Sequence, residues 1–112
     1  MSQFMALVVE DDPLPREVIV DLLKDQGLEV IECTTAEAAE LVLAAAGPEL
    51  LAVVINLDAV MTGVELAEFA KGKFPRLNVV IMAGKEPERL PKDTRFLQKP
   101  YRSAELLEAV LH

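Results

Sequence analysis

Short apolar runs alternate with helical patterns along the whole of this chain. Each run is short enough for a strand that is buried on both faces. The runs are Phe4–Val9, Leu28–Ile31, Leu50–Ile55 and Val79–Met82, and Arg95–Gln98 is expected to form a short fifth strand. Strands that alternate with helices across short connections pair in parallel, with right-handed crossovers. The pattern therefore predicts an α/β fold, a three-layer α/β/α sandwich with a five-stranded parallel sheet, formed as a single domain by residues 1–112.

Capping signals predict where the helices begin. A small polar side chain accepts a hydrogen bond from the first turn, and proline fits the first helical position. The start signals are Asp12 with Pro13, Thr34 with Glu37 as a capping box, Gly63 at a tight turn, and Ser103. The segment Gly84–Thr94 contains Pro87 and Pro91 and little helical periodicity. A fourth helix between the last two strands is therefore expected to be short or absent.

Helical spacing also predicts which apolar side chains face the core. In the first helix these are Leu14, Val18, Ile19, Leu22 and Leu23; in the second, Ala38, Leu41, Val42 and Ala45; in the third, Leu66 and Phe69. We expect these side chains to be buried and the opposite side of each helix to be exposed.

Composition excludes several classes of protein. The net charge of -8 disfavours binding to a nucleic-acid backbone, and the single cysteine excludes an internal disulfide framework. No apolar stretch is long enough to span a membrane, and Met1–Gln3 carries no charge typical of a signal peptide. We therefore expect a cytoplasmic domain that binds neither nucleic acid nor membrane.

Charge is divided unevenly along the chain. Residues 1–70 contain two basic and fourteen acidic residues, whereas residues 71–112 contain nine basic and five acidic residues. A cluster of cations in an acidic chain indicates a docking surface for an acidic partner.

Charged residues follow the strands at the edge of the sheet where sites form in parallel α/β folds. Glu10, Asp11 and Asp12 come directly after the first strand, and Lys99 follows the fifth. Asp12 is expected to cap a helix. The other two carboxylates and Lys99 favour a divalent cation or a buried ion pair.

Three motifs in this order resemble the receiver domain of two-component response regulators, and the resemblance covers the whole chain. The motifs are Val8–Pro13, Met61–Leu66 and Phe96–Tyr101. The resemblance implies a flavodoxin-like fold with strand order 2-1-3-4-5. It also implies a signalling module rather than an enzyme.

The chemistry of that family follows from its charges. A carboxylate at the end of the third strand accepts a phosphoryl group and becomes an acyl phosphate. An acidic pair and this carboxylate hold Mg²⁺, and a lysine pairs with the phosphate. A Ser or Thr hydroxyl on the fourth strand bonds the phosphate and moves together with an aromatic side chain on the fifth.

The match to this machinery is partial. By the resemblance, Glu10 and Asp11 are the acidic pair, Lys99 is the lysine, Pro100 the proline after it, which is often cis, and Phe96 the switch aromatic. Val54 stands at the phosphoacceptor position, or Ile55 if the loop is counted without a gap, and Met82 stands at the hydroxyl position. Neither valine nor methionine can do that chemistry.

The absence of a carboxylate at the phosphoacceptor position changes what the neighbouring site residues can bind. A magnesium site of Glu10, Asp11 and Asn56 would be weak or lost, so no cofactor is required. Lys99 would pair with Asp11 or Glu10, or turn to solvent, because a buried unpaired ammonium is costly. Val54 and Met82 are expected to pack together and fill the site with apolar surface.

The sequence therefore predicts a phosphorylation-independent receiver-like module that acts through protein–protein contacts. Its partner would be a sensor kinase, an output protein or a scaffold, and a homo-oligomer is a further option. The expected docking face is basic and contains Lys85, Arg89, Lys92, Arg95 and Arg102.

Three alternatives remain open at this point. The first is a working phosphoacceptor receiver that uses Asp58 or Asp11. The second is a flavodoxin-type small-ligand-binding domain, although Glu10–Asp12 would repel a phosphate after the first strand. The third is a phosphatase with an aspartyl nucleophile, for which Glu10 and Asp12 are a poor match.

Overall fold

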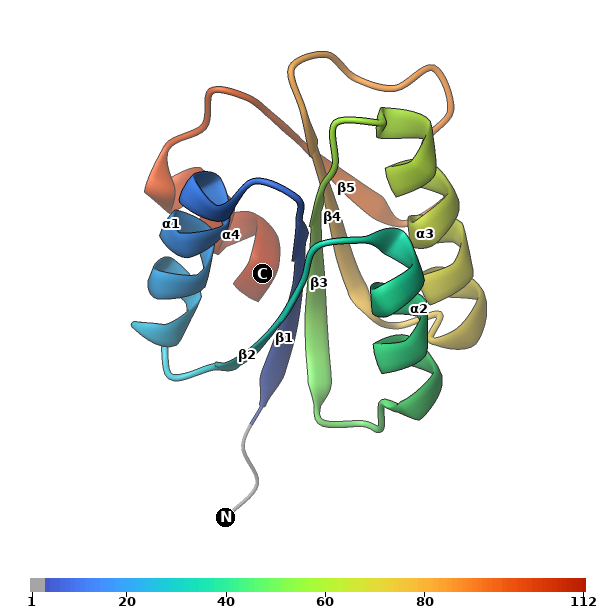
Figure 1. The fold of residues 1–112 in the computed structure, drawn as a ribbon, viewed down its shortest axis with the longest axis horizontal. Coiled ribbons are helices and arrows are strands. Elements are labelled where there is room, and N and C mark those ends of the chain that lie inside the picture. Colours follow the sequence, from blue (N-terminus) through green and yellow to red (C-terminus); the bar gives the residue numbers. More distant parts are fainter. Residues whose placement is uncertain (1–3) are drawn as a thin grey trace.

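A parallel sheet lies at the centre of the computed structural model, which describes residues 4–112 (Figure 1). The five strands are β1 (Met5–Glu10), β2 (Glu29–Cys33), β3 (Leu50–Asn56), β4 (Asn78–Ala83) and β5 (Thr94–Gln98). Their order across the sheet is β2-β1-β3-β4-β5, and every pair is parallel. The predicted sheet and its order are confirmed. The prediction about Met1–Gln3 lies outside the described residues.

Helices cover both faces of this sheet. The four helices are α1 (Pro13–Lys24), α2 (Ala36–Ala45), α3 (Val60–Lys73) and α4 (Ser103–Leu111). In Figure 1, α1 and α4 lie on one side of the sheet, and α2 and α3 on the other. No helix among residues 4–112 is long and apolar enough to cross a membrane.

The strands supply a separate core to each layer, because successive side chains point to opposite faces. Leu7, Val53 and Ile81 pack in the core under α2 and α3. Ala6, Val54 and Met82 pack in the core under α1 and α4. Helices cover both faces of the central strands, which explains why β1, β3 and β4 are nearly continuous apolar runs, whereas the edge strands β2 and β5 keep exposed polar residues.

Two of the predicted helix starts are shifted by one residue. The Thr35 hydroxyl, not that of Thr34, accepts the hydrogen bond of the Ala38 N–H at the start of α2. At α4 the N-cap residue is Arg102, and Ser103 is the first helical residue. The Arg102 N–H donates to the Glu105 carboxylate at 2.9 Å, so this first turn is held without a serine cap.

Helix α3 begins earlier than the sequence predicts. It starts at Val60, so Gly63 lies inside the first turn rather than at its start. A Cβ atom at Gly63 would lie 3.0 Å from Cγ2 of Ile55 on β3. Gly63 therefore allows α3 to approach the sheet closely, and it does not form a tight turn.

The buried faces of the helices also differ in part from the prediction. Ile19, Val20 and Leu23 are buried in α1, whereas Leu14 and Val18 are exposed. Leu41 and Phe69 were predicted to face the core, and both side chains are exposed. The apolar residues of these helices span more than one face, so spacing alone selects the wrong subset.

No helix forms between β4 and β5, in agreement with the sequence. This segment is pinned at two points. The Arg89 guanidinium pairs with Glu68 of α3 at 2.9 Å, and Leu90 packs on the core under α2 and α3. Leu90 and the ion pair therefore hold the segment against α3.

Candidate functional site

Two polar side chains are buried at the carboxyl end of the sheet. Glu10 ends β1 and Asn56 ends β3, and the two residues are paired across the strands. Their exposed fractions are 2% and 5%. Because buried polar groups need partners, the hydrogen bonds of these two side chains determine what the site can do.

A chain of hydrogen bonds links three side chains from three strand ends. The Lys99 ammonium donates to Oδ1 of Asn56 at 2.7 Å. The amide nitrogen of Asn56 in turn donates to the Glu10 carboxylate. The sequence predicts that Lys99 pairs directly with Asp11 or Glu10, or turns to solvent, but in the structure the neutral amide of Asn56 lies between the Lys99 ammonium and the Glu10 carboxylate. We call Glu10, Asn56 and Lys99 the polar cluster.

Both carboxylate oxygens of Glu10 accept hydrogen bonds. The second oxygen accepts from the Asp12 N–H at 3.0 Å, while the Asp12 side chain caps α1 as predicted. Burial is the main cause that raises the pKa of the Glu10 carboxyl, and the neighbouring Asp11 raises it further. Hydrogen bonds from the Asp12 N–H and from Asn56 act in the opposite direction.

Tyr101 lies close to the polar cluster. Burial raises the pKa of its phenol, and the negative charge of Glu10 adds to this effect. The ring packs on the core that contains Val54 and Met82. Tyr101 therefore connects the polar cluster to the core under α1 and α4.

Val54 does not belong to the polar cluster. Its side chain is fully buried, two residues before the end of β3, and it pairs with Val8 and Val80 on the adjacent strands. Met82 is buried in the same core. The expected apolar packing of these two residues agrees with the structure, but it lies beneath the polar cluster, and Asn56 occupies the strand end.

Sequence reasoning considered Asn56 only as a weak metal ligand. The signal that could have identified it is its position as the last residue of a buried strand, next to the acidic pair. The match of the segment Val54–Leu57 to the family motif instead indicates Val54, and counting back from Gly63 without a gap indicates Ile55.

The comparisons with known proteins agree with this architecture. The family model of the response regulator receiver domain matches residues 6–111. The chain belongs to this family. Its fold is the flavodoxin-like fold expected from the resemblance. A comparison with curated protein sequences found no match to the chain.

Solved structures of receiver domains are similar along nearly the whole chain. The receiver domain of the hybrid histidine kinase CckA is 26% identical, with a TM-score of 0.79 and coverage of 95% of this chain and 94% of that one. A receiver protein from Sinorhizobium medicae WSM419 is 23% identical, with a TM-score of 0.86 and coverage of 96% and 91%. Chemotaxis protein CheY4 of Vibrio cholerae is 19% identical, with a TM-score of 0.77 and coverage of 97% and 99%.

This receiver domain is thus a signalling module of the two-component type, and its partners are proteins. The match does not support the flavodoxin-type ligand-binding domain or the aspartyl phosphatase as alternatives. The remaining question is which step of receiver chemistry these residues can still perform.

The donor set of this receiver domain does not fit Mg²⁺. Both oxygens of Glu10 already accept hydrogen bonds, and the Lys99 ammonium occupies the carbonyl oxygen of Asn56. Within residues 4–112, no three Asp, Glu, His or Cys side chains lie close enough together to hold a metal ion. To bind Mg²⁺, the site would need two carboxylates and a further oxygen ligand that does not accept a hydrogen bond from Lys99.

The other predicted site residues surround the polar cluster. Phe96 is half-buried on β5, paired with Ile81 of β4. The Lys99–Pro100 peptide bond is cis, as the resemblance implies. Asp11 and Asp58 are exposed.

The five cations of the predicted docking face are all exposed, but they do not form one flat surface. Arg89 pairs with α3, whereas the Arg95 guanidinium donates to the Glu108 and Ala109 carbonyls of α4. Lys85 follows β4, Lys92 precedes β5, and Arg102 precedes α4. The five side chains therefore surround the edge strand β5.

Proposed function

We propose that this receiver domain acts in two-component signalling without accepting a phosphoryl group on β3, and that binding of partner proteins sets its output. The support comes from one contact, the 2.7 Å hydrogen bond from Lys99 Nζ to Asn56 Oδ1. In the family this lysine pairs with the phosphate on the acceptor. Here its partner is an amide oxygen, and an amide does not attack phosphorus at neutral pH.

We assign the acceptor position to Asn56 in place of Val54 or Ile55. Asn56 ends β3 opposite Glu10 and touches Lys99, so it has the neighbours that an acceptor carboxylate needs. Val54 has neither neighbour and is fully buried in the core. The two assignments predict different results when aspartate is introduced.

The test is incubation with Mg²⁺ and acetyl phosphate, followed by intact-protein mass spectrometry. Wild type is expected to gain no phosphoryl group. Asn56→Asp is expected to gain one, because it restores a carboxylate beside Glu10 and Lys99. Val54→Asp is the matched control, with the same substitution two residues earlier on β3, and it is expected to gain none.

Two results would contradict the proposal. A phosphoryl group on wild type would reinstate the alternative of a working receiver. Asp58→Asn and Asp11→Asn would then locate the acceptor, since both residues are exposed. A gain in Val54→Asp but not in Asn56→Asp would return the acceptor position to Val54.

Magnesium provides an independent readout at the same position. Asn56→Asp replaces the amide donor to Glu10 with a second carboxylate, which should destabilise the fold by about 1–3 kcal/mol without metal. Adding Mg²⁺ should then raise the melting temperature of Asn56→Asp and leave that of wild type unchanged. An equal rise in wild type would mean that Glu10, Asp11 and Asn56 bind the ion after all.

We also propose that the exposed cations around β5 contact an acidic partner protein. The charge of residues 71–112 supports this, because they contain nine basic and five acidic residues in a chain with a net charge of -8. Binding that weakens as salt rises would agree with this proposal, and binding that does not depend on salt would contradict it.

A further inference from the structure

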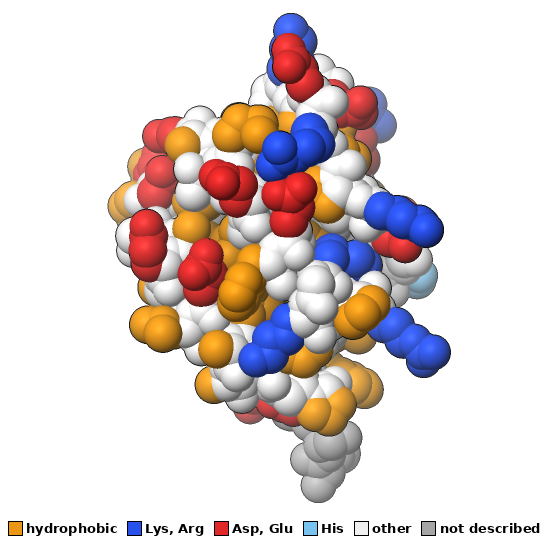
Figure 2. Space-filling view, turned by 90° about the vertical axis from the view of Figure 1, so that its right-hand side faces the viewer, with side chains coloured by type: hydrophobic (Ala, Val, Ile, Leu, Met, Phe, Trp, Pro, Cys, Tyr) orange, Lys and Arg blue, Asp and Glu red, His pale blue; other side chains and the backbone are white. Residues whose placement is uncertain are grey.

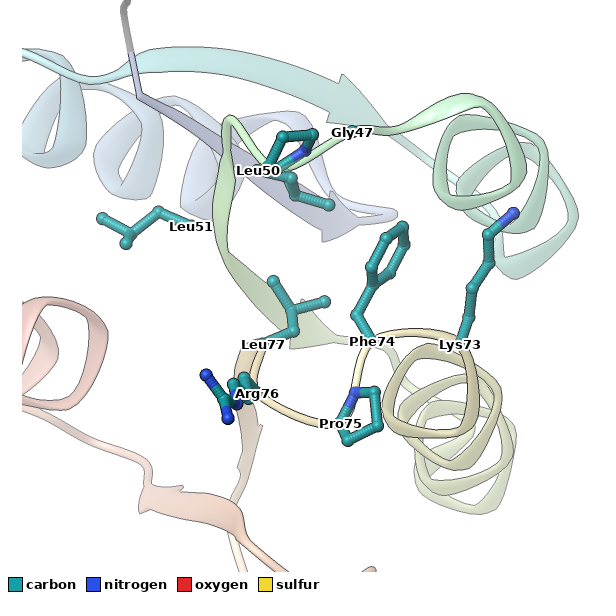
Figure 3. A pocket seen from close by; sticks show the side chains of 9 residues that line it. Gly47, Leu50, Leu51, Lys73, Phe74, Pro75, Arg76 and Leu77 are labelled. Carbon is teal, nitrogen blue, oxygen red and sulfur yellow. The ribbon is translucent and has the colours of Figure 1, made fainter.

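A groove with an apolar floor lies at the amino end of the sheet, opposite the polar cluster. Its volume is about 520 Å³, within the range of ordinary binding pockets. The floor is formed by Pro48, Leu50, Leu51, Phe74, Pro75 and Leu77. Figure 3 shows the side chains of Leu50, Phe74 and Leu77 converging in this groove, which we call the apolar groove.

The exposure of Leu51 results from a break in strand register. Met5 pairs with Leu50 and Ala6 pairs with Ala52, so Leu51 is an extra residue in β3. Its side chain is 37% exposed, although the other six residues of β3 are buried. An apolar side chain that is displaced to the surface beside an apolar floor is a feature of docking sites.

Hydrogen bonds fix the walls of the apolar groove. The Lys73 ammonium donates to the Ala44 carbonyl at 2.7 Å and thereby ties the end of α3 to the end of α2. The Lys71 ammonium donates to the Pro75 and Leu77 carbonyls at 2.8 and 3.0 Å. A ligand would therefore meet a largely formed site and would lose little free energy in ordering it.

Cations flank the floor. Lys73 and Arg76 line opposite sides of the apolar groove (Figure 3). Arg76 is exposed, and within residues 4–112 its guanidinium makes no hydrogen bond or ion pair. No acidic residue occurs in the sequence between Glu68 and Glu86. Figure 2, which looks onto α2 and α3, shows Lys and Arg side chains mainly at the right and bottom, and most acidic ones to the left and top.

A second groove continues the first toward α4. It has a volume of about 360 Å³ and shares Leu51, Arg76 and Leu77 with the apolar groove. Lys71 and Arg95 also line it, and Asp93 is the one acidic side chain among its lining residues. We call this the basic groove. Together the two grooves extend across the amino ends of β3, β4 and β5. The apolar groove comes first and the basic groove follows it.

We propose that these two grooves bind an acidic peptide segment of a partner protein. Apolar side chains of the segment would pack on Leu51 and Phe74, and its carboxylates would lie against Arg76 and the cations of the basic groove. Charge complementarity selects such a segment, because four basic side chains line the two grooves and Asp93 is the one acidic side chain among their lining residues. The proposal does not depend on whether β3 carries a phosphoacceptor.

The experiment is a titration of the full chain with a capped peptide that has two central leucines and three glutamates on each side. Amide chemical shifts in ¹⁵N-labelled protein are the readout. We expect saturable shifts at Leu51 and over residues 73–78. We also expect Arg76→Ala to weaken binding by about fivefold or more, since it removes the cation shared by both grooves.

Two further variants distinguish binding in the two grooves from nonspecific electrostatic attraction of the peptide. Leu51→Asp changes an exposed side chain, so it should fold, and it should abolish binding. Lys24→Ala removes one exposed cation in the last turn of α1, outside both grooves and outside the cations around β5, and should change the affinity by less than about twofold. A peptide with lysines in place of the glutamates should not bind.

Four results would overturn the proposal. The first is the absence of shifts with the acidic peptide. The second is shifts located away from the two grooves. The third is equal weakening by Arg76→Ala and Lys24→Ala. The fourth is a wild-type dimer in sedimentation that Leu51→Asp dissociates, which would make a second copy of this chain the occupant. Loss of the proposed phosphorylation behaviour would leave all four outcomes unaffected.

Discussion

Glu10 is deeply buried, and each of its two carboxylate oxygens accepts one hydrogen bond. One carboxylate oxygen accepts a hydrogen bond from the Asp12 N–H and the other from the Asn56 amide. Neither donor carries a charge, and the Lys99 ammonium reaches Asn56 instead of Glu10. The energetic cost of burying the carboxylate is therefore offset by dipoles rather than by an ion pair.

This environment predicts how stability depends on pH. The folded-state pKa of Glu10 lies above its ordinary value of 4.5, so the folded state holds this proton more tightly than the unfolded state. The stabilisation from the protonated form is present below that ordinary pKa and is lost as pH rises through the folded pKa. In Glu10→Gln this position does not titrate, so wild type should lose stability relative to Glu10→Gln as pH rises.

Urea unfolding followed by circular dichroism, at a series of values from about pH 4 to pH 8, measures this difference. The other titrating groups are common to both proteins and largely cancel. A difference that stays constant, or that grows in favour of wild type with rising pH, would show that burial does not dominate the titration of Glu10.

The sequence could predict the residue types at the site better than their register. The acidic pair and Lys99 can be recognised from the sequence, because carboxylates and a lysine that follow strands at one end of a parallel sheet are not core composition. Asn56 was harder to recognise, since a neutral amide at a strand end gives no charge signal and loop lengths vary. Its role depends on the pairing of Glu10 with Asn56 across two strands, which spacing along one chain does not reveal.

At the scale of elements, the strands were easier to predict than the helix faces. The central strands β1, β3 and β4 are buried on both faces and need only a nearly continuous apolar run, whereas the edge strands β2 and β5 are partly exposed. All five predicted segments are strands in the structure. The helices contain more apolar residues than one face can bury. In α1, Leu14 is 74% exposed and Leu23 is fully buried, although both fit helical spacing. The position of the sheet, which a helix sequence does not encode alone, decides between them.

That difference can be tested with a matched pair of substitutions in α1. Leu23→Ala should lower the free energy of unfolding by about 2–5 kcal/mol, because it leaves a cavity in the core under α1 and α4. Leu14→Ala should change it by less than about 0.5 kcal/mol, because its side chain is already in water. Chemical denaturation of both variants makes the comparison. Similar losses in the two variants would mean that Leu14 is buried, as the spacing predicts.

For the molecule as a whole, repulsion among acidic side chains outweighs the attraction within ion pairs. The net charge is -8, and residues 4–112 contain two ion pairs, Arg16 with Glu32 and Arg89 with Glu68. Both pairs have at least one exposed partner, so each should contribute little to stability. Repulsion among the unpaired carboxylates therefore opposes folding, and it is concentrated in residues 1–70, where acidic residues outnumber basic ones by twelve.

Salt should consequently stabilise this protein. Raising sodium chloride from about 10 mM to about 200 mM shortens the screening length to within the size of the domain, so the melting temperature should rise by about 2–5 °C. Potassium chloride over the same range should give the same rise, because screening depends on ionic strength and not on the cation. Sucrose at matched osmolality controls for solvent exclusion. A fall in melting temperature with salt would mean that the ion pairs and the cationic end of the sheet outweigh the repulsion among carboxylates.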